Sequence, residues 1–319
     1  MRGGVRSATA FAPGGVGNVG PGLDILGLAL AGKGDTVRAE WSEAPGIHIQ
    51  EQGHPDLPSD ANRHTSSLAA RAVLDRVENN PIRDRGIALT VTKGLPLSGG
   101  QGGSAASAVA GAVAVNALLG NPLGRLELIE ASLEAEACVS GRHADNVAPS
   151  VLGGIVLIRS LDPLDLVQLP VPEELWVVVA QPDQRLRTAD ARSVLPQEVS
   201  RAVALHQAAQ VGAMVAALAA NDYELLGRSI DDRIAEPARA GLLPGFREAK
   251  QAALEAGALG SSISGAGPTA FALVRGHEAG SRVAAAMTSA YAACGQRSEV
   301  RITQIDRVGA RIIPESRRE

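Results

Sequence analysis

Three glycine-rich segments constrain what this chain can fold into more than any other feature of its sequence. The segments are APGGVGNVGPGLD at 12–24, SGGQGGS at 98–104 and SGAGPTAFAL at 264–273. Because glycine has no Cβ, it allows sharp turns and lets main-chain N–H groups approach a ligand closely. A single segment of this kind is commonly a plain turn. Three of them in one chain favour a binding site assembled from loops.

The second segment has the context of a phosphate-binding loop. A predicted strand over 87–91 precedes it, and an apolar helix over 105–119 follows it. Main-chain N–H groups at a helix N-terminus attract anions, and Ser104 can cap that helix or offer its hydroxyl to a phosphate or a metal ion. A P-loop would need Gly-Lys-Ser or Gly-Lys-Thr, but residues 102–104 are Gly-Gly-Ser. The segment therefore predicts phosphate binding outside the P-loop class, with a flexible turn as the alternative.

The first segment matches the dinucleotide-binding pattern only in its letters. Residues 15–20 spell G-x-G-x-x-G, and Glu40 lies where an acidic residue would contact a ribose. That site also needs a helix that starts within the glycines, and Pro21-Gly22 interrupts such a helix. The sequence therefore disfavours a nicotinamide-dependent oxidoreductase.

The composition bears on partners and location. The chain has 319 residues, of which 45% are hydrophobic and 20% charged, so it can bury the cores of two domains. Its net charge of −4 suggests no cationic face for nucleic acid or anionic lipid. Residues 1–15 lack the apolar run of a signal peptide, and the apolar segment 105–119 is too short to span a membrane. We therefore predict a cytoplasmic protein with neither nucleic-acid nor membrane partners.

Hydrophobic periodicity predicts an α+β protein in two domains, 1–165 and 166–319, with the boundary at a proline cluster near 160–172. In the first domain we predict strands over 5–11, 37–41, 47–49 and 87–91, and helices from 60 to 77, over 105–119 and from 122 to 140. In the second we predict strands over 175–181, 261–264, 269–274 and 299–305, a long helix over 198–220, and helices around 239, before 257 and through the 280s.

The three segments together resemble the signature motifs of the GHMP kinases, and the resemblance covers nearly the whole chain. The third motif, S-G-A-G-P-T, is intact at 264–269. HADNVAP at 143–149, TADARSVLP at 188–196 and DDRIAEPARAGLLPG at 231–245 further resemble the homoserine kinases within that superfamily. The first motif, P-x-S-x-A-N-L-G-P-G-F-D, is matched by Pro13, Asn18, Gly20, Pro21, Gly22 and Asp24, and the second, P-x-x-x-G-L-G-S-S-A-A, by Pro96, Gly100, Gly102, Ser104, Ala105 and Ala106.

This resemblance implies both a fold and an activity. The fold would be the two-domain GHMP kinase fold, with a nucleotide-binding N-terminal domain and a ferredoxin-like C-terminal domain. The activity would be phosphorylation of the side-chain hydroxyl of L-homoserine by ATP with Mg²⁺, a step of threonine biosynthesis, carried out by a homodimer. The chain departs from the second motif at Gln101, where the pattern has Leu, and at Gly103, where it has Ser. The loop therefore carries one hydroxyl fewer.

The resemblance also implies where ATP and Mg²⁺ bind. Ser104 and Glu136 would hold Mg²⁺, because Glu136 stands before a Ser-Gly pair as the family's magnesium ligand does. Glu130 and Glu134 are the alternatives, and a glutamate on such a helix is, by residue type alone, more often part of a solvated face. The residues implied at the ATP phosphates are Pro96, Leu97, Ser98, Gly99, Gly100, Gln101, Gly102, Gly103 and Ser104.

An amino-acid acceptor needs an anion for its ammonium group and a guanidinium for its carboxylate. The resemblance implies Asp24 for the first role and Arg192 with Arg239 for the second. Asn18 and His143 would orient the rest of the substrate. Without the resemblance, His143 would be a structural residue, and Arg239 would cap its helix or form an ion pair at the surface.

Three further residues are implied at the reacting groups. Asn146 would lie near the hydroxyl and Thr188 near the transferred phosphate, while Asp145 would bind the ammonium group or act as a base. The general base stays unassigned. Two other functions share the fold and stay open: a decarboxylase acting on a phosphorylated acid, and a sensor that binds a ligand without turnover.

Overall fold

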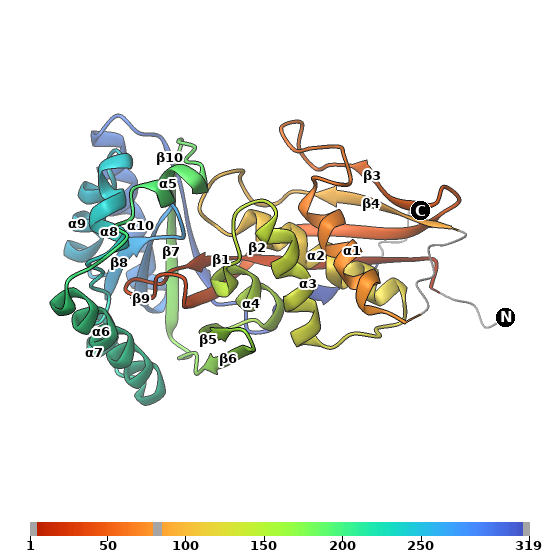
Figure 1. The fold of residues 1–319 in the computed structure, drawn as a ribbon. Helices are drawn as coiled ribbons and strands as arrows, with labels where there is room; N and C mark the ends of the chain where they lie inside the picture. Colours follow the sequence, from red (N-terminus) through yellow and green to blue (C-terminus); the bar gives the residue numbers. More distant parts are fainter. Residues whose placement is uncertain (1–4, 79–84, 315–319) are drawn as a thin grey trace.

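The computed structural model describes residues 5–78 and 85–314, so residues 1–4 and 79–84 of the predicted N-terminal domain and 315–319 of the predicted C-terminal domain lie outside the described part. Two β-sheets organise the elongated molecule, one in each half (Figure 1). The first half contains β1 (Ser7–Gly17), β2 (Leu26–Ser42), β3 (Gly46–Glu51), α1 (Thr65–Arg76), β4 (Gly86–Thr92), α2 (Gly103–Leu118), α3 (Arg125–Ala137), α4 (Ala144–Leu152), β5 (Ile155–Leu161), β6 (Leu164–Leu169) and the distant β11 (Arg311–Ile312).

The first sheet has seven strands in the order β11-β1-β2-β4-β3, with β5 pairing to β2 and β6 pairing to β5. The apolar helix α2 packs against α1, α3 and the strands β1 and β2, and most of its residues are buried. Small residues make this packing possible. A Cβ at Gly111 would lie 2.5 Å from the main-chain oxygen of Ser66 on α1, so only glycine allows the two helices to approach so closely.

The second half forms a four-stranded sheet in the order β10-β7-β9-β8, in which all neighbouring strands are antiparallel. Helices connect β7 to β8 and β9 to β10, so the connectivity is β-α-β-β-α-β, which is ferredoxin-like. Its elements are β7 (Leu175–Pro182), α5 (Thr188–Ser193), α6 (Arg201–Ala220), α7 (Tyr223–Arg228), α8 (Ala235–Arg239), η2 (Ala240–Leu242), α9 (Phe246–Glu255), β8 (Gly260–Ile263), β9 (Ala270–Arg275), α10 (Gly276–Ala293) and β10 (Ser298–Gln304).

A shared core joins the two halves. Successive side chains of a strand point to opposite faces, so Val178 packs with α9 and α10 while Val177 and Val179 point the other way. Val177 and Val179 belong to a buried cluster that also contains Val16 of β1 and Leu28 of β2. The first sheet and the C-terminal sheet therefore bury apolar surface against each other, which fixes the walls of the space between them.

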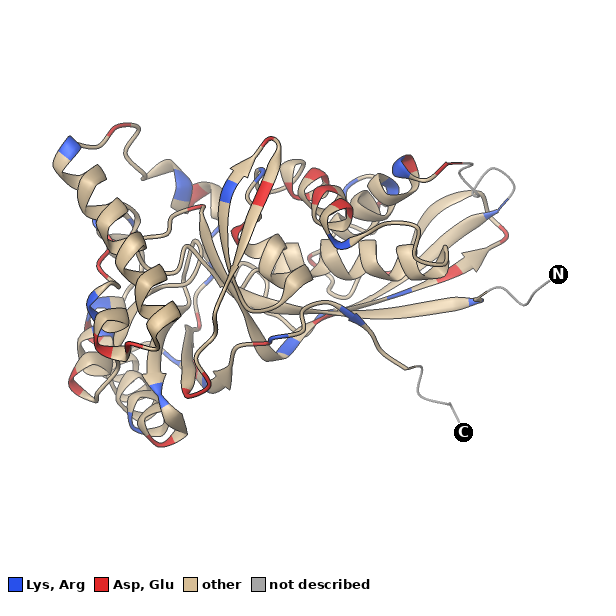
Figure 2. Ribbon diagram, turned by 90° about the horizontal axis from the view of Figure 1, so that it is seen from below, with Lys and Arg blue, Asp and Glu red and all other residues tan. Residues whose placement is uncertain are grey.

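Helix α6 is a long element with few buried residues. It is long and apolar enough to cross a membrane by length and composition, and 22% of its most apolar window is buried. A helix of this kind also occurs outside membranes, so the finding does not by itself identify a membrane segment. Figure 1 shows α6 with α7 at the outer edge of the C-terminal half. Acidic and basic residues are mixed over both halves (Figure 2), in keeping with the small net charge of −4.

The structure differs from the sequence predictions in several elements. β2 begins at Leu26, eleven residues before the predicted strand, and β1 continues through Pro13 into the first glycine-rich segment. The first helix begins at Thr65, because His64 is its N-cap and accepts a hydrogen bond from Ser66 N. α4, α5, α7, the β5–β6 hairpin and β11 were not predicted. The predicted boundary at 165/166 falls inside β6, which pairs with β5 of the first sheet, and the division at that residue stays a prediction.

Candidate active site

A cleft of about 570 Å³ lies between the two halves and is lined by residues from both. All three glycine-rich segments reach it, and so do the ends of α3, α4 and α5. Of the site residues predicted from the sequence, Gln101 alone does not line the cleft. Those that do are Asn18, Asp24, Pro96, Leu97, Ser98, Gly99, Gly100, Gly102, Gly103, Ser104, Glu136, His143, Asp145, Asn146, Thr188, Arg192 and Arg239.

The second glycine-rich segment is held with its carbonyl groups turned toward the third. The carbonyl oxygens of Gly99 and Gly100 accept hydrogen bonds from Thr269 Oγ1 at 2.5 Å and Ser264 Oγ at 2.7 Å. Gly100 and Gly102 have φ values of +76° and +67°, which residues with a side chain rarely adopt. No described side chain caps the N-terminus of α2. The N–H groups at this helix end are therefore available to an anion in the cleft.

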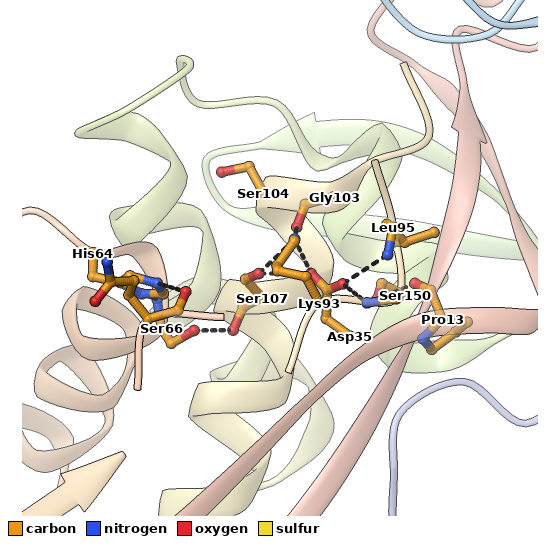
Figure 3. Close-up of polar contacts among 12 residues, drawn as sticks. Pro13, Asp35, His64, Ser66, Lys93, Leu95, Gly103, Ser104, Ser107 and Ser150 are labelled. Atoms are coloured by element: carbon orange, nitrogen blue, oxygen red, sulfur yellow. Dashed lines mark hydrogen bonds and ion pairs between the residues drawn. The ribbon is translucent and has the colours of Figure 1, made fainter. Parts of the chain in front are cut away.

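A buried ion pair supports the loop from below (Figure 3). Lys93 Nζ pairs with the fully buried Asp35 and donates to the carbonyl of Gly103 at 2.9 Å. Ser107 Oγ donates to the same carboxylate at 2.6 Å. The other carboxylate oxygen of Asp35 accepts hydrogen bonds from the N–H groups of Gly94 at 3.1 Å and of Leu95 at 3.2 Å. This network ties the strand before the loop to the first turn of α2.

Glu136 lies at the C-terminal end of α3, facing the start of α2. Its carboxylate accepts hydrogen bonds from Ser104 Oγ and, at 2.7 Å, from Ser140 Oγ. Burial raises the pKa of Glu136, although the hydrogen bonds from Ser104 and Ser140 and the charge of Lys93 oppose this. Glu134 instead forms an exposed ion pair with Arg76. Neither Glu134 nor Glu130 lines the cleft in the described structure, so Glu136 is the glutamate placed beside Ser104.

At the other end of the cleft, Asp24 and Arg192 are paired with each other. The two guanidinium nitrogens of Arg192 donate to the carboxylate of Asp24 at 2.9 and 3.1 Å, and His143 Nδ1 lies 3.4 Å from it. Burial opposes ionisation of Asp24, but the hydrogen bond from Arg192 and the charges of His143, Arg192 and Arg239 outweigh it and lower its pKa. From the sequence, Asp24 and Arg192 are each expected to meet a substrate group, whereas in the structure they neutralise one another.

A second carboxylate lies beside this pair. Asp145 is 2% exposed and accepts a hydrogen bond from Asn18 N at 3.1 Å. Burial, followed by the charge of Asp24, raises the pKa of Asp145 to about 7. Its neighbour Asn146 lies against the phosphate loop, because a Cβ at Gly102 would sit 2.8 Å from Asn146 Oδ1. That buried oxygen has no hydrogen-bond partner within 5–78 and 85–314, so it is free to accept one from a ligand.

Arg239 holds two segments of the cleft wall. It is 2% exposed, and it donates to the carbonyls of Ala191 at 3.1 Å and Gly265 at 2.9 Å. The alternative of a surface role is therefore wrong, and Glu236 pairs with Lys250 instead. Burial and the charge of Arg192 lower the pKa of Arg239. Thr188, the first residue of α5, lies exposed at the edge of the cleft.

Comparisons with known proteins agree with this arrangement. The GHMP kinases N-terminal domain model matches residues 65–154 and the GHMP kinases C-terminal model matches residues 214–293. A homoserine kinase of Chlorobium phaeobacteroides is 42% identical over 320 residues, which covers 97% of this chain and 100% of that protein. A homoserine kinase of Arabidopsis thaliana is 42% identical over 316 residues, covering 96% of this chain and 85% of that protein. The chain belongs to the homoserine kinase family of GHMP kinases.

A solved structure supports the same conclusion. A homoserine kinase from Cytophaga hutchinsonii is 41% identical, with a TM-score of 0.92 and coverage of 98% of this chain and 99% of that one. The predicted superfamily, fold class and enzyme class are thereby confirmed. The disfavoured oxidoreductase does not fit, because residues 15–20 form the end of β1 and a turn, with no helix starting there in the described chain.

Three residues that support the phosphate loop were not predicted from the sequence, although two of them, Lys93 and Ser107, line the cleft. Asp35, Lys93 and Ser107 hold the phosphate loop through side chains separated by up to 72 positions in the sequence. A lysine just before a glycine-rich loop was the only available signal, and it carried no indication of its partner. The sequence motifs identified the residues that face the cleft, but not the residues that hold the phosphate loop in place.

Proposed function

We propose that the cleft transfers the terminal phosphoryl group of ATP to the side-chain hydroxyl of L-homoserine, giving O-phospho-L-homoserine for threonine biosynthesis. One observation carries the proposal: a single cleft has an uncapped helix N-terminus with a glycine loop at one end and the Asp24–Arg192 pair at the other. The first end suits a polyphosphate and the second an amino acid. A homodimer and a cytoplasmic location, without nucleic-acid or membrane partners, are part of the same proposal.

The residues at the phosphate end also fit Mg²⁺. Ser104 and Glu136 would hold the ion, since Mg²⁺ typically takes one or two protein oxygens and completes its shell with phosphate oxygens and water. When bound, Mg²⁺ neutralises negative charge that builds up on the transferring phosphoryl group. The main chain of 98–104 and the N-terminus of α2 position the phosphates, and the hydrogen bonds of Ser104 and Ser140 hold the Glu136 carboxylate in place.

At the acceptor end, a zwitterionic amino acid would separate Asp24 from Arg192 and form an ion pair with each of them. The ammonium group lies between Asp24 and Asp145, because a cation there offsets the burial and the charge of Asp24, which together raise the pKa of Asp145. The substrate carboxylate then pairs with the guanidinium of Arg192, whose Nε has no partner among the described residues. The same carboxylate also faces Arg239. Asn18 and His143 flank the pair and orient the substrate.

The acceptor hydroxyl must point from this end toward the phosphate loop. Asn146 is placed to guide it, because its unpartnered Oδ1 lies against Gly102 and can accept the hydroxyl hydrogen. Thr188 lies across the cleft on α5, where its hydroxyl can contact the transferred phosphoryl group. In this assignment Asp145 binds the ammonium group. Positioning and charge neutralisation supply the catalysis, as is general in phosphoryl transfer.

The test is ADP release across a panel of acceptors, with the mass of each product determined. L-Homoserine should be phosphorylated with a kcat/KM at least about a hundredfold above those of 4-hydroxybutyrate, which lacks the amino group, and 3-aminopropan-1-ol, which lacks the carboxylate. Equal use of these stripped alcohols would contradict amino-acid recognition. Preference for mevalonate would move the protein to another branch of the superfamily, release of CO₂ would favour a decarboxylase, and ligand binding without ADP release would favour a sensor.

The raised pKa of Asp145 predicts that this side chain lowers the stability of the protein at neutral pH, although it serves substrate binding. The pKa is about 7 in the folded protein and 3.8 for a free side chain, so the folded state retains a proton that the unfolded state has lost. Stability therefore falls as pH rises from about 4 to about 7 and stays lower above that. We expect Asp145→Asn to raise Tm at pH 8, to leave Tm unchanged near pH 4, and to weaken homoserine binding. Thermal melts at both pH values test this, and a lower Tm at pH 8 would contradict it.

A further inference from the structure

The side chain of Gln101 faces away from the cleft. Unlike every other residue of 96–104, all of which the structure describes, it does not line the cleft, and it is 4% exposed. Its Nε2 donates to Gln181 Oε1 on β7 at 2.8 Å, and its Oε1 accepts a hydrogen bond from Arg301 Nη2 on β10 at 3.1 Å. Gln101 thus attaches the loop of one half of the molecule to two strands of the other.

The main chain of Gln101 makes a further connection. Its carbonyl oxygen accepts a hydrogen bond from Gly15 N at 3.1 Å, and a Cβ at Gly14 would lie 2.9 Å from the same oxygen. The first glycine-rich segment, the phosphate loop and the C-terminal sheet therefore meet at one residue. A displacement of Gln101 would disturb all three together.

Arg301 brings a positive charge to this junction. Its Nη1 donates to the main-chain carbonyl of Ala31 at 3.3 Å, while its buried Nε has no hydrogen-bond partner within 5–78 and 85–314. Both of its acceptors, Ala31 and Gln101, are uncharged. Burial lowers the pKa of the guanidinium, the charge of Glu299 on the same strand opposes this only in part, and the group is nevertheless protonated. An incompletely paired, partly desolvated cation is costly to fold, and an anion bound on the other face of the loop would reduce that cost.

We propose that Gln101 and Arg301 form a positioning pair, which fixes the phosphate loop against the C-terminal sheet and places a positive charge behind it. The inference rests on the proposed function, because it concerns ATP binding at that loop. Neither side chain lines the cleft, so both act through the loop. The pair also accounts for the departure from the family pattern at position 101. A Leu there could neither accept a hydrogen bond from Arg301 nor donate one to Gln181.

A double-mutant cycle tests the pair through steady-state kinetics. We expect Gln101→Leu and Arg301→Met each to raise KM for ATP about tenfold, with kcat and KM for homoserine within about twofold of wild type. The double variant should be no worse than the poorer single variant, because an apolar pair leaves no guanidinium without its partner. Additive effects of the two substitutions, or an unchanged KM for ATP in folded variants, would overturn the proposal.

Two further variants separate positioning from general support. Thr303→Val is the matched control, because Thr303 Oγ1 also bonds the carbonyl of Ala31 from β10, at 2.8 Å, but does not contact the loop. It should keep the wild-type KM for ATP. Gln101→Glu keeps the shape of the side chain and the acceptor for Arg301, loses the donor to Gln181 and cancels the charge of Arg301, so KM for ATP should rise. A wild-type KM for ATP in Gln101→Glu would contradict the role of the charge.

Calorimetric titration of the wild-type protein with ATP, without acceptor, separates failure of the inference from failure of the proposed function. ATP binding that is weakened in Gln101→Leu and Arg301→Met supports the positioning pair. ATP binding that both variants retain unchanged overturns the pair alone. A wild-type protein that bound no ATP would overturn the proposed function and the pair with it.

Discussion

Replacing Glu136 with Gln is expected to reduce kcat by about a hundredfold to a thousandfold and to raise the Mg²⁺ concentration needed for half-maximal activity. Gln keeps the size of the side chain and can still contact Ser104 and Ser140, but it removes the negative charge beside the phosphate loop. Because burial already raises the pKa of Glu136, the neutral side chain should not lower Tm. Initial rates measured over a range of Mg²⁺ concentrations test this expectation.

Glu134→Gln is the matched control on the same helix. Glu134 is 57% exposed and pairs with Arg76 at the surface, so its loss should leave kcat and the Mg²⁺ requirement near wild type. Full activity of Glu136→Gln at low Mg²⁺ would remove Glu136 from the metal site. A loss of activity in Glu134→Gln with none in Glu136→Gln would transfer the assignment to Glu134.

The second large effect is expected at Arg192. Arg192→Met leaves Asp24 without its bidentate partner and removes a guanidinium from the substrate carboxylate, so kcat/KM for homoserine should fall at least about a hundredfold. A hundredfold change corresponds to about 2.8 kcal/mol of transition-state stabilisation. ATP binding without acceptor should stay close to wild type. Arg282→Met, which breaks an exposed ion pair on α10, is the control and should behave like wild type.

The carboxylate-free acceptor makes this test specific. If Arg192 recognises the substrate carboxylate, Arg192→Met should be penalised far less with 3-aminopropan-1-ol than with homoserine, because that contact is already missing. An equal loss with both acceptors would mean that Arg192 supports the cleft through Asp24 alone. Arg239 is less suited to such an experiment, since its bonds to Ala191 and Gly265 make a structural effect unavoidable.

The fold could be predicted from the sequence wherever a pattern was local. The four strands of the C-terminal sheet lie within one residue of their predicted limits, because each is a short local run, which in β7 and β9 consists mainly of apolar and β-branched residues. β11 was missed because its pairing with β1 depends on a partner about 300 positions away, which no window of sequence contains. The β5–β6 hairpin is local, and it was missed because the prolines at 163, 170 and 172 were interpreted as a domain boundary. Likewise, the left-handed conformations of Asn18 and Asp24 cannot be inferred from their residue types.

The candidate site, like the fold, could be predicted only where the signal was local in the sequence. The motifs located the residues that face the cleft, since a phosphate or a carboxylate restricts which residue types can contact it. They did not reveal that Asp24 and Arg192, 168 positions apart, would be paired with each other, or that Gln101 would turn away from the nucleotide. Those features arise from tertiary packing. Which unlike charges meet depends on how the two halves are assembled.

The pairing of β11 with β1 has a consequence during translation, because the two strands are synthesised at opposite ends of the process. Ala10 and Phe11 pair with Ile312 and Arg311, so one edge of the N-terminal sheet is completed by residues synthesised about 300 positions later. Throughout most of translation, that edge of β1 presents unpaired main-chain groups, which can recruit a strand from another nascent chain. The N-terminal half can collapse around α2 early, but its sheet acquires its last strand only after the C-terminal half has emerged.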